Sequence, residues 1–482
     1  MSGGAYKPLS DAELKQVFDS ALQILEELGM GQATPEFKEV ITKAGGSYTE
    51  ENDRLLFPRD LVLGAIDTAA KEFRLYNFSG DGYLTIGGDR VYFSTGGAAV
   101  SMLDHETQRF RQSTVSDLYD IARLLDTLDN VHLCIRPVVT RDMEASRDVD
   151  LNTAYAMMCG TTKPIGTSMF QPEQVHEVAT MLDIAAGGEG EFRKRPFCQA
   201  NNTFVVPPLR FAEDSALCMA EQVRTGMPIN LLSAGQAGAT SPAFLAGSLV
   251  QALAECLAAL TVVNTMSPGH PCIMGLWPFV SDLRTGAMTG GSGEEAVLNA
   301  AAAQVANYLG LPSDVAAGMS DSKLADAQAG HEKALTVGLA ANAGSNIVYE
   351  SCGMLASIMA FSHEMAVIDN DMLAAINRTV RGVDINEQSM SVEAMREVIF
   401  GAGHFLGHPD TLNIMQSEYT YPEVGDRLSQ DDWVDAGGLV AVDRAHDYVV
   451  RTLAEHHPQH IDAATDAKIR EAFPITLDRP IG

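Results

Sequence analysis

The aromatic residues at the ends of β-rich runs are the first candidates for chemistry. The chain has only two tryptophans, and one of them, Trp277, stands two residues before Phe279. Phe170 and Tyr349 end other β-rich runs, and Glu350 follows directly. A cluster of rings near acids suits a quaternary ammonium group, which has no N–H to donate and is held through cation–π contacts. The alternative is that these rings only fill the core.

A dense polar stretch follows another β-rich run and continues into a helix. Asp321 opens it, and Gln328 and His331 stand three residues apart, which places them on one helical face. We expect Gln328 and His331 to donate hydrogen bonds to a substrate carboxylate or to a cofactor face, with Asp321 ordering them. The competing interpretation is that Asp321 and Ser322 only cap the helix.

Eight β-rich runs alternate with helical runs between Tyr92 and Arg378. The runs are Tyr92–Leu103, Val131–Val139, Pro164–Phe170, Pro196–Val205, Pro228–Gly235, Pro271–Val280, Pro312–Asp321 and Asn346–Met354. Strict alternation predicts a parallel sheet, and eight units predict a closed (β/α)8 barrel, the TIM-barrel class. An open doubly wound sheet is the runner-up, but the first run lacks its Gly-rich dinucleotide turn.

The composition predicts three segments of different character. Residues 1–90 are turn-rich and form an N-terminal cap, residues 91–385 form the α/β barrel, and residues 386–482 form a polar, helical C-terminal extension. The apolar run Phe244–Val263 is interrupted by polar residues, so it predicts a buried helix and not a membrane span. The polar N-terminus lacks the layout of a signal peptide, which favours a cytoplasmic protein.

The ends of barrel strands normally assemble the active site, together with the loops that follow them. The residues at these ends are Thr95, Arg136, Ser168, Phe170, Asn201, Asn202, Ser233, Gln236, Trp277, Phe279, Asp321, Tyr349 and Glu350. The set combines rings, amides, hydroxyls and acids. It holds no histidine pair and no cysteine at metal-ligand spacing, so we expect no bound metal.

The net charge of −30 at pH 7 limits the partners. It disfavours nucleic acid and anionic membranes and suits a cationic substrate or a basic partner, although it equally fits a solubility feature. The seven cysteines form no CxxC pair, which argues against a disulfide framework. A homo-oligomer stays open.

Three stretches of the chain resemble the trimethylamine methyltransferase family. They are Met319-Ser320-Asp321-Ser322-Lys323 with the run Asp326 to Lys333, the run Asn346 to Leu355, and Phe361-Ser362-His363-Glu364. The resemblance implies a (β/α)8 barrel that docks a separate corrinoid-binding protein over its mouth. It also implies transfer of a methyl group from a methylated amine to Co(I).

Family members acting on trimethylamine carry pyrrolysine near the seventh strand, whereas this chain has ordinary residues from Gly318 to Asp321. It therefore resembles the branch that uses glycine betaine or a related betaine. We expect the site residues to be catalytic Asp321, Gln328, His331 and Glu350, and substrate-binding Phe170, Asn201, Asn202, Trp277, Phe279 and Tyr349. The corrinoid would come with the partner, and the chain would hold no metal of its own.

Two other classes of function stay open. Another barrel enzyme, a lyase or a Schiff-base aldolase, would need a lysine at a strand end, and Lys323 is the one candidate. A non-catalytic betaine-binding protein would share the aromatic residues but transfer no methyl group. Detecting methyl transfer to a corrinoid separates these classes.

Overall fold

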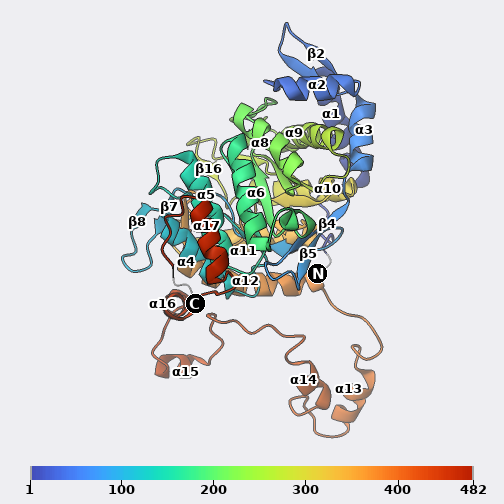
Figure 1. Ribbon diagram of the computed structural model, residues 1–482. Coiled ribbons are helices and arrows are strands. Elements are labelled where there is room, and N and C mark those ends of the chain that lie inside the picture. Colours follow the sequence, from blue (N-terminus) through green and yellow to red (C-terminus); the bar gives the residue numbers. More distant parts are fainter. Residues whose placement is uncertain (1–2, 480–482) are drawn as a thin grey trace.

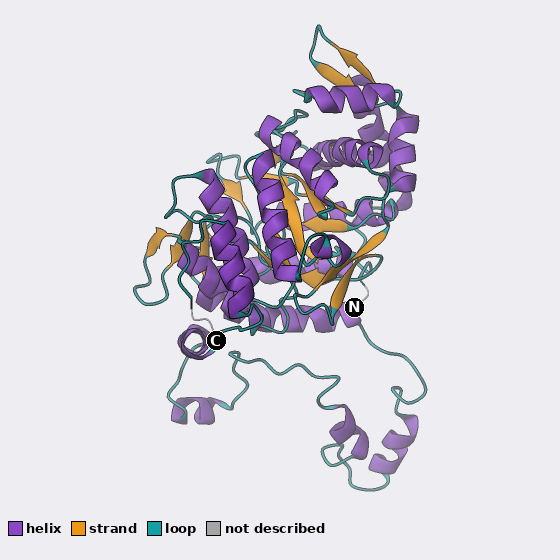
Figure 2. Ribbon diagram, in the orientation of Figure 1, coloured by secondary structure: helices purple, strands orange, loops and turns teal. Residues whose placement is uncertain are grey.

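Eight parallel strands form the centre of the protein in this computed structural model, which describes residues 3–479 (Figures 1 and 2). In neighbour order they are β6 (Tyr92–Phe93), β18 (Ile347–Val348), β17 (Ser313–Val315), β14 (Cys272–Leu276), β12 (Ile229–Ser233), β11 (Cys198–Asn202), β10 (Ile165–Thr167) and β9 (Cys134–Ile135). A parallel bridge between Ser94 and Leu133 joins the two outer strands. The predicted (β/α)8 fold class is confirmed.

Prolines mark where several barrel strands begin. Proline has no N–H to give to a ladder, so it is tolerated at a strand's first position. Its carbonyl still accepts: Cys134 donates to Pro164, Ile229 to Pro271 and Met274 to Pro312, at 2.8–3.0 Å. The prolines therefore start each strand without interrupting the sheet.

Eight helices wrap the barrel and follow its strands in turn. They are α4 (Val115–Asp126), α5 (Ser146–Gly160), α6 (Pro172–Ala186), α8 (Glu213–Thr225), α9 (Leu245–Met266), α10 (Gly293–Tyr308), α11 (Ala327–Ala343) and α12 (His363–Arg381), with the short α7 (Glu191–Lys194) after α6. Thr114, Ser292 and Asp326 cap the first turns of α4, α10 and α11 with their side chains, as expected of these residue types.

Helix α9 is long and apolar enough to cross a membrane by length and composition alone. Its most apolar stretch is 83% buried inside the protein, with the N-terminal helices packed on one side and the barrel strands on the other. This helix is therefore a core element, as the sequence predicted for Phe244–Val263.

The N-terminal residues pack in a layer on α9 and also close one end of the barrel. The layer consists of α1 (Asp11–Glu27), β1 (Met30–Gly31), α2 (Pro35–Lys43), β2 (Ser47–Thr49), β3 (Arg54–Leu56) and α3 (Arg59–Thr68). The hairpin β4 (Glu72–Tyr76) and β5 (Tyr83–Gly87) places Leu75 and Ile86 in one buried cluster with Ile273 and Ile347 of the barrel. The hairpin thus closes the end at which the strands begin.

Two small sheets build up the opposite end, where the strands finish. One contains β13 (Gln236–Ala237), β15 (Phe279–Ser281) and β16 (Met288–Thr289), and the other β19 (Met354–Leu355), β20 (Ala360–Ser362), β7 (Ser101–Leu103) and β8 (Phe110–Gln112). The β-rich runs Tyr92–Leu103 and Pro271–Val280 therefore each hold two strands of different sheets. Gly96-Gly97 and Pro278 interrupt them, because neither residue type sustains a strand interior.

The C-terminal residues leave the barrel and return to it. After α12 the chain forms α13 (Val392–Ile399), α14 (Pro409–Ile414) and α15 (Gln430–Asp435), which Figure 1 shows well away from the barrel. It returns as α16 (Ala441–Glu455), which packs on α12 and α4, and α17 (Ala463–Ala472), which packs on α6. We call residues 382–416 the lobe.

Candidate functional site

The inside of the barrel is polar at its centre and aromatic at its open end. Alternation along each strand decides which residues face inward. On β11, Cys198 and Ala200 belong to the core between strands and helices, so Gln199 and Asn201 face the barrel interior. The Gln199 amide donates to Asn201 Oδ1 at 3.1 Å. Both side chains lie deep in the barrel, so the structure places the predicted ligand Asn201 inside it; its contact with a substrate stays a prediction.

Asn202 has the opposite orientation from its neighbour Asn201. Its amide nitrogen donates to Ser215 O and Gln222 Oε1, both at 2.9 Å and both on α8. The structure therefore places this predicted substrate ligand behind the strand, on the helix side. A one-residue difference in a strand reverses the face that a side chain occupies.

Three of the four predicted aromatic ligands gather at the open end. The ring of Trp277 lies 4.6 Å from that of Tyr349 and 6.0 Å from that of Phe279, measured between centroids. All three are buried, and a Cβ at Gly96 would overlap the Tyr349 ring, so only glycine fits there. Phe170 stands apart on the loop after β10, where it is 46% exposed.

Asp314 lies beneath this aromatic cluster and was not among the predicted site residues. The Trp277 indole N–H donates to its Oδ1 at 2.5 Å, and Asn230 donates to its Oδ2 at 3.0 Å. Burial raises the pKa of Asp314 to about 8, against the lowering effect of these two donors. The available signal was an acid inside a predicted buried strand, because such a group is seldom buried without a role.

Glu350 is a buried carboxyl without a hydrogen-bond donor. Neither of its oxygens has a partner in residues 3–479, and a Cβ at Gly97 would collide with one of them. Burial and the nearby Asp314 raise its pKa well above the usual range, although Lys333 acts in the opposite direction. Lys333 itself pairs with Asp369 at 3.2 Å and donates to Gly318 O. Glu350 is thus an acid with no counter-ion of its own.

Arg136 follows β9 and is a half-buried base. Its Nη1 is enclosed and has no hydrogen-bond acceptor within the described chain. Burial lowers its pKa, while Tyr349 and Asp150 act to raise it. Asp150 Oδ2 accepts a hydrogen bond from the Phe170 N–H at 2.8 Å, and burial raises the pKa of Asp150 to about 7. Arg136 Nη1 is therefore a free donor for an anion.

The polar stretch that begins at Asp321 connects loops to one another at the rim of the open end. Asp321 Oδ1 accepts from Gly290 N at 2.8 Å and Ser357 Oγ at 2.6 Å, which joins three loops. Its main-chain N–H donates to Glu332, and Glu332 also accepts from Gln328 at 2.8 Å. Glu332 was not foreseen as the centre of this network.

The His331 side chain is exposed, and its Nδ1 lies 3.0 Å from Ala327 O of its own helix. Gln328 is exposed as well. The two side chains thus share the outer rim and do not enter the barrel. Their proposed contacts with substrate or cofactor stay a prediction.

Among residues 3–479 no group of three or more His, Cys, Asp or Glu side chains has the geometry to hold a metal ion. All seven cysteines are buried and free. The expectation that cobalt arrives only with a partner protein stays a prediction.

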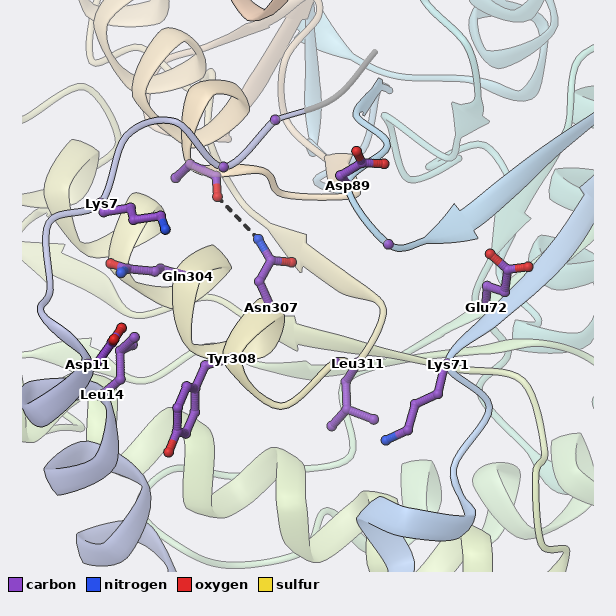
Figure 3. Close-up of a pocket in the computed structure, with 15 residues that line it drawn as sticks. Lys7, Asp11, Leu14, Lys71, Glu72, Asp89, Gln304, Asn307, Tyr308 and Leu311 are labelled. Atoms are coloured by element: carbon purple, nitrogen blue, oxygen red, sulfur yellow. Dashed lines mark hydrogen bonds between the residues drawn. The ribbon is translucent and has the colours of Figure 1, made fainter.

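A cavity of about 560 Å³ lies at the closed end of the barrel (Figure 3). Lys7 and Lys71 point toward it together with acidic side chains, so no single ligand charge is favoured. The amides on its wall are already occupied, because Gln304 bonds the backbone of Leu9 and Asn307 bonds two carbonyls near Gly344. Barrel enzymes place their chemistry at the other end, so we assign this cavity no catalytic role.

One family model matches nearly the whole chain. The model described as trimethylamine methyltransferase covers residues 2–475. A trimethylamine methyltransferase from Desulfitobacterium hafniense is 31% identical over 97% of this chain and 94% of its own length. A glycine betaine methyltransferase from the same species, strain Y51, is 28% identical over 99% of this chain and 98% of its own length.

The fold matches that of a solved methyltransferase. The crystal structure of the hydroxylamine MtmB complex gives a TM-score of 0.51 over 94% of this chain and 95% of its own, at 13% identity. At that identity the likeness concerns the fold alone. The extent of the family match and the 31% identity over nearly the full length decide the assignment: this chain belongs to the trimethylamine methyltransferase family and is a methyltransferase.

Proposed function

We propose that this protein removes a methyl group from a betaine, glycine betaine or a related compound, and delivers it to the Co(I) of a corrinoid carried by a separate protein. The observation that carries the proposal is the combination at the open end of the barrel. A buried aromatic cluster for a cation stands in one site with Arg136, a half-buried cation near Tyr349 whose Nη1 has no acceptor within residues 3–479. A betaine carries a trimethylammonium group that suits the rings and a carboxylate that suits Arg136.

The aromatic cluster suits the trimethylammonium end of such a molecule. The indole N–H of Trp277 is engaged by Asp314, so the ring offers its face and not its donor. Asp314 and Glu350 place two carboxyls near this face, and a bound cation would favour their ionised forms. Binding of a cationic ligand would therefore favour loss of the proton from these carboxyls.

Arg136 suits the carboxylate end. A guanidinium binds a carboxylate through two parallel hydrogen bonds, and burial strengthens this contact. Trimethylamine has no such group. The family resemblance also ties trimethylamine to a pyrrolysine that is absent between Gly318 and Asp321. We therefore propose that trimethylamine is not turned over.

The reaction requires the protein mainly to position the substrate. A quaternary nitrogen already carries full positive charge, so a neutral tertiary amine leaves without protonation. The corrinoid supplies the methyl acceptor. The residues of this chain hold the N–CH3 bond at the open end of the barrel, keep water from it and orient the carboxylate. This explains a site with buried rings and an arginine but without a nucleophile.

The rim of the open end fits the docking of a corrinoid protein. Six strand-to-helix connections each expose a large apolar side chain there, namely Phe170, Val206, Phe244, Leu283, Leu324 and Met359. Apolar side chains gathered on one face mark interaction surfaces. We propose that Gln328 and His331 belong to the same contact. A reducing cytoplasm fits both a Co(I) acceptor and seven free thiols.

The alternatives fit the geometry less well. A Schiff-base lysine must be neutral and therefore desolvated, yet Lys323 is exposed and donates to Asp321 O at 2.6 Å. A non-catalytic betaine-binding protein stays compatible with the cage and is separated by turnover.

The experiment is to mix the protein with Co(I) cobalamin and a panel of glycine betaine, carnitine, choline and trimethylamine. We expect conversion of the Co(I) spectrum to that of methyl-Co(III) with at least one carboxylate-bearing quaternary amine. Turnover of trimethylamine alone would overturn the proposal. Calorimetric binding of a betaine without any methyl transfer would instead favour the binding protein.

A further inference from the structure

A turn at the open end of the barrel holds three adjacent residues in the left-handed region of the backbone. The φ angles are 53° at Ala356, 53° at Ser357 and 74° at Ile358, between β19 and β20. Side chains clash with the backbone in this region, so single residues adopt it and runs of them are rare. Within residues 3–479, Ile358 is the one β-branched residue with a positive φ. The turn is therefore strained, and its surroundings must hold it in place.

The loop after β17 supplies the hydrogen bonds that hold this turn. The Ala356 N–H donates to Ser322 O at 2.7 Å. The Ser357 N–H donates to Ser320 O at 2.8 Å, and the Ser357 hydroxyl donates to Asp321 Oδ1 at 2.6 Å. Strained backbone persists where neighbouring contacts over-determine its conformation. Ser357 makes two of these three bonds, so it is the main anchor of the turn.

The side chain of Ile358 stands where the aromatic cluster meets solvent. It packs against the buried cluster to which the three rings belong. Three half-buried apolar residues border that cluster at the open end, namely Ala234, Met288 and Ile358. A Cβ at Gly97 would lie 2.8 Å from Ile358 Cγ1, so the isoleucine also covers the loop after β6. Ile358 therefore belongs to the mouth of the cluster.

The type of residue at position 358 indicates that its side chain is the reason for the turn. Glycine adopts a positive φ without a steric penalty, and asparagine does so more readily than most residues. A turn that served only to reverse the chain would be less strained with either of them. Isoleucine is disfavoured there, and its packing against the cluster offsets the strain. The turn thus places one branched apolar side chain at the mouth.

A branched apolar side chain at this point suits the N-methyl groups of a quaternary ammonium ion. The faces of the rings attract the charge, whereas the methyl groups on the solvent side need apolar contact that keeps water away. A wall fixed by its backbone also limits size, because a packed site tolerates an extra methylene poorly.

We propose that Ile358 forms the outer wall of the ammonium pocket and limits the N-alkyl groups that it admits to methyl, with Ser357 as the residue that positions this wall. The proposal rests on the proposed function, because it assigns a further residue to the same pocket. Met359 follows directly and is 51% exposed at the rim. The wall therefore lies next to the surface that we propose for the corrinoid protein.

The test measures binding of tetramethylammonium and tetraethylammonium ions to the full chain by calorimetric titration. Ile358→Gly removes the wall and relieves the strain. Tetramethylammonium should then bind roughly ten-fold more weakly, the value of one or two buried methyl groups. Tetraethylammonium should bind more tightly than it binds the wild type, because the variant has room for it. The matched control is Ala356→Gly, which relieves strain in the same turn but keeps Ile358, and should leave both Kd values unchanged.

Ser357→Ala tests the positioning role. It removes the hydroxyl bond to Asp321 and should weaken tetramethylammonium binding by less than Ile358→Gly does. Because Ser357 acts through Ile358, the double variant should bind no more weakly than Ile358→Gly alone. Additive losses would give Ser357 a separate role and overturn its assignment as the positioning residue.

The outcomes separate this proposal from the proposed function. If the wild type demethylates a betaine but Ile358→Gly binds both ions as the wild type does, Ile358 is not part of the pocket. A gain for tetraethylammonium in Ala356→Gly as well would mean that a looser turn, and not a missing wall, admits the larger ion. Ile358→Asn, which also suits the left-handed conformation, should repeat the result of Ile358→Gly for tetramethylammonium. A wild type that binds neither ion and transfers no methyl group would contradict the proposed function and this proposal with it.

Discussion

The two ends of the barrel use one sheet for opposite purposes. At the closed end, the hairpin β4–β5 places Leu75 and Ile86 against Ile273 and Ile347, and hydrocarbon fills the space. At the open end, within the described chain, buried Glu350 has no hydrogen-bond donor and the enclosed Nη1 of half-buried Arg136 has no acceptor. A buried polar group without a partner costs about 1–3 kcal/mol.

This difference separates residues that maintain the fold from residues that await a ligand. The side chains at the closed end pack against one another, whereas the open end holds charged groups and rings that lack a partner within the described chain. Changes at the closed end should therefore alter stability without altering binding, whereas changes at the open end should alter binding. Four substitutions test this division, from the largest expected effect to the smallest.

Leu75→Ala should lower the free energy of unfolding by roughly 2–5 kcal/mol, because it leaves a cavity in a fully buried cluster. The Kd for a betaine should not change. Denaturant unfolding and calorimetric titration measure the two quantities. A changed Kd at unchanged stability would show that the closed end communicates with the site.

Arg136→Met should weaken betaine binding by roughly 1.5–3 kcal/mol, since a charge-assisted contact to the carboxylate is lost. Choline, which has the ammonium group but no carboxylate, is the control ligand and should bind the variant as it binds the wild type. Equal losses for choline and glycine betaine would remove Arg136 from the carboxylate site.

Trp277→Ala should weaken binding of the trimethylammonium group by roughly 1–2 kcal/mol, or more where the cation is fully desolvated. The analogue 3,3-dimethylbutanoate, which keeps the carboxylate but has a neutral tert-butyl group in place of the trimethylammonium group, should lose much less. Trp277→Phe keeps a ring but not the N–H to Asp314, so it should retain most of the affinity. Equal losses for both ligands would mean that the site recognises shape and not charge.

Asp314→Asn should reduce the pH dependence of binding. With a pKa of about 8 in the free protein, Asp314 is largely protonated at pH 7 and ionises as the pH rises. A cationic ligand favours the ionised form, so wild-type affinity should rise up to about pH 8 and then level off. The variant should lose the part of this rise that is centred near pH 8, and any remaining pH dependence should come from Glu350.

The stability of the same pair of proteins provides the control. The pKa of Asp314 lies above its unfolded value, so the wild type loses stability as the pH rises from about 4 to about 8. Asp314→Asn should reduce this loss. A wild-type affinity that falls toward pH 8 would contradict the assigned role.

The barrel could be predicted because its signals are local. Prolines open strands, Thr114, Ser292 and Asp326 cap helices, and the strand ends then follow. Trp277 and Tyr349 could be found in the same way, since rare aromatic residues at strand ends are visible in the sequence. Their meeting at 4.6 Å required the closed sheet.

The missed residues depended on strand parity and on long-range pairing. Asn201 and Asn202 are indistinguishable in sequence, yet one faces the barrel interior and the other faces α8. Asp314 gains its importance from Trp277 and Asn230, which are 37 and 84 residues away. Arg136 was visible as a strand end, but the lack of an acceptor for its Nη1 within the described chain becomes apparent only after folding.

The burial of every cysteine gives the protein a built-in reporter. All seven thiols are enclosed, and burial raises the pKa of Cys134 and of Cys198 to about 12, so alkylating reagents should react only when the barrel opens. The last cysteine is Cys352, so the lobe carries none. A single cysteine introduced at Ser389 would therefore be labelled first. The native thiols would time the opening of the barrel, and the added thiol would report the accessibility of the lobe.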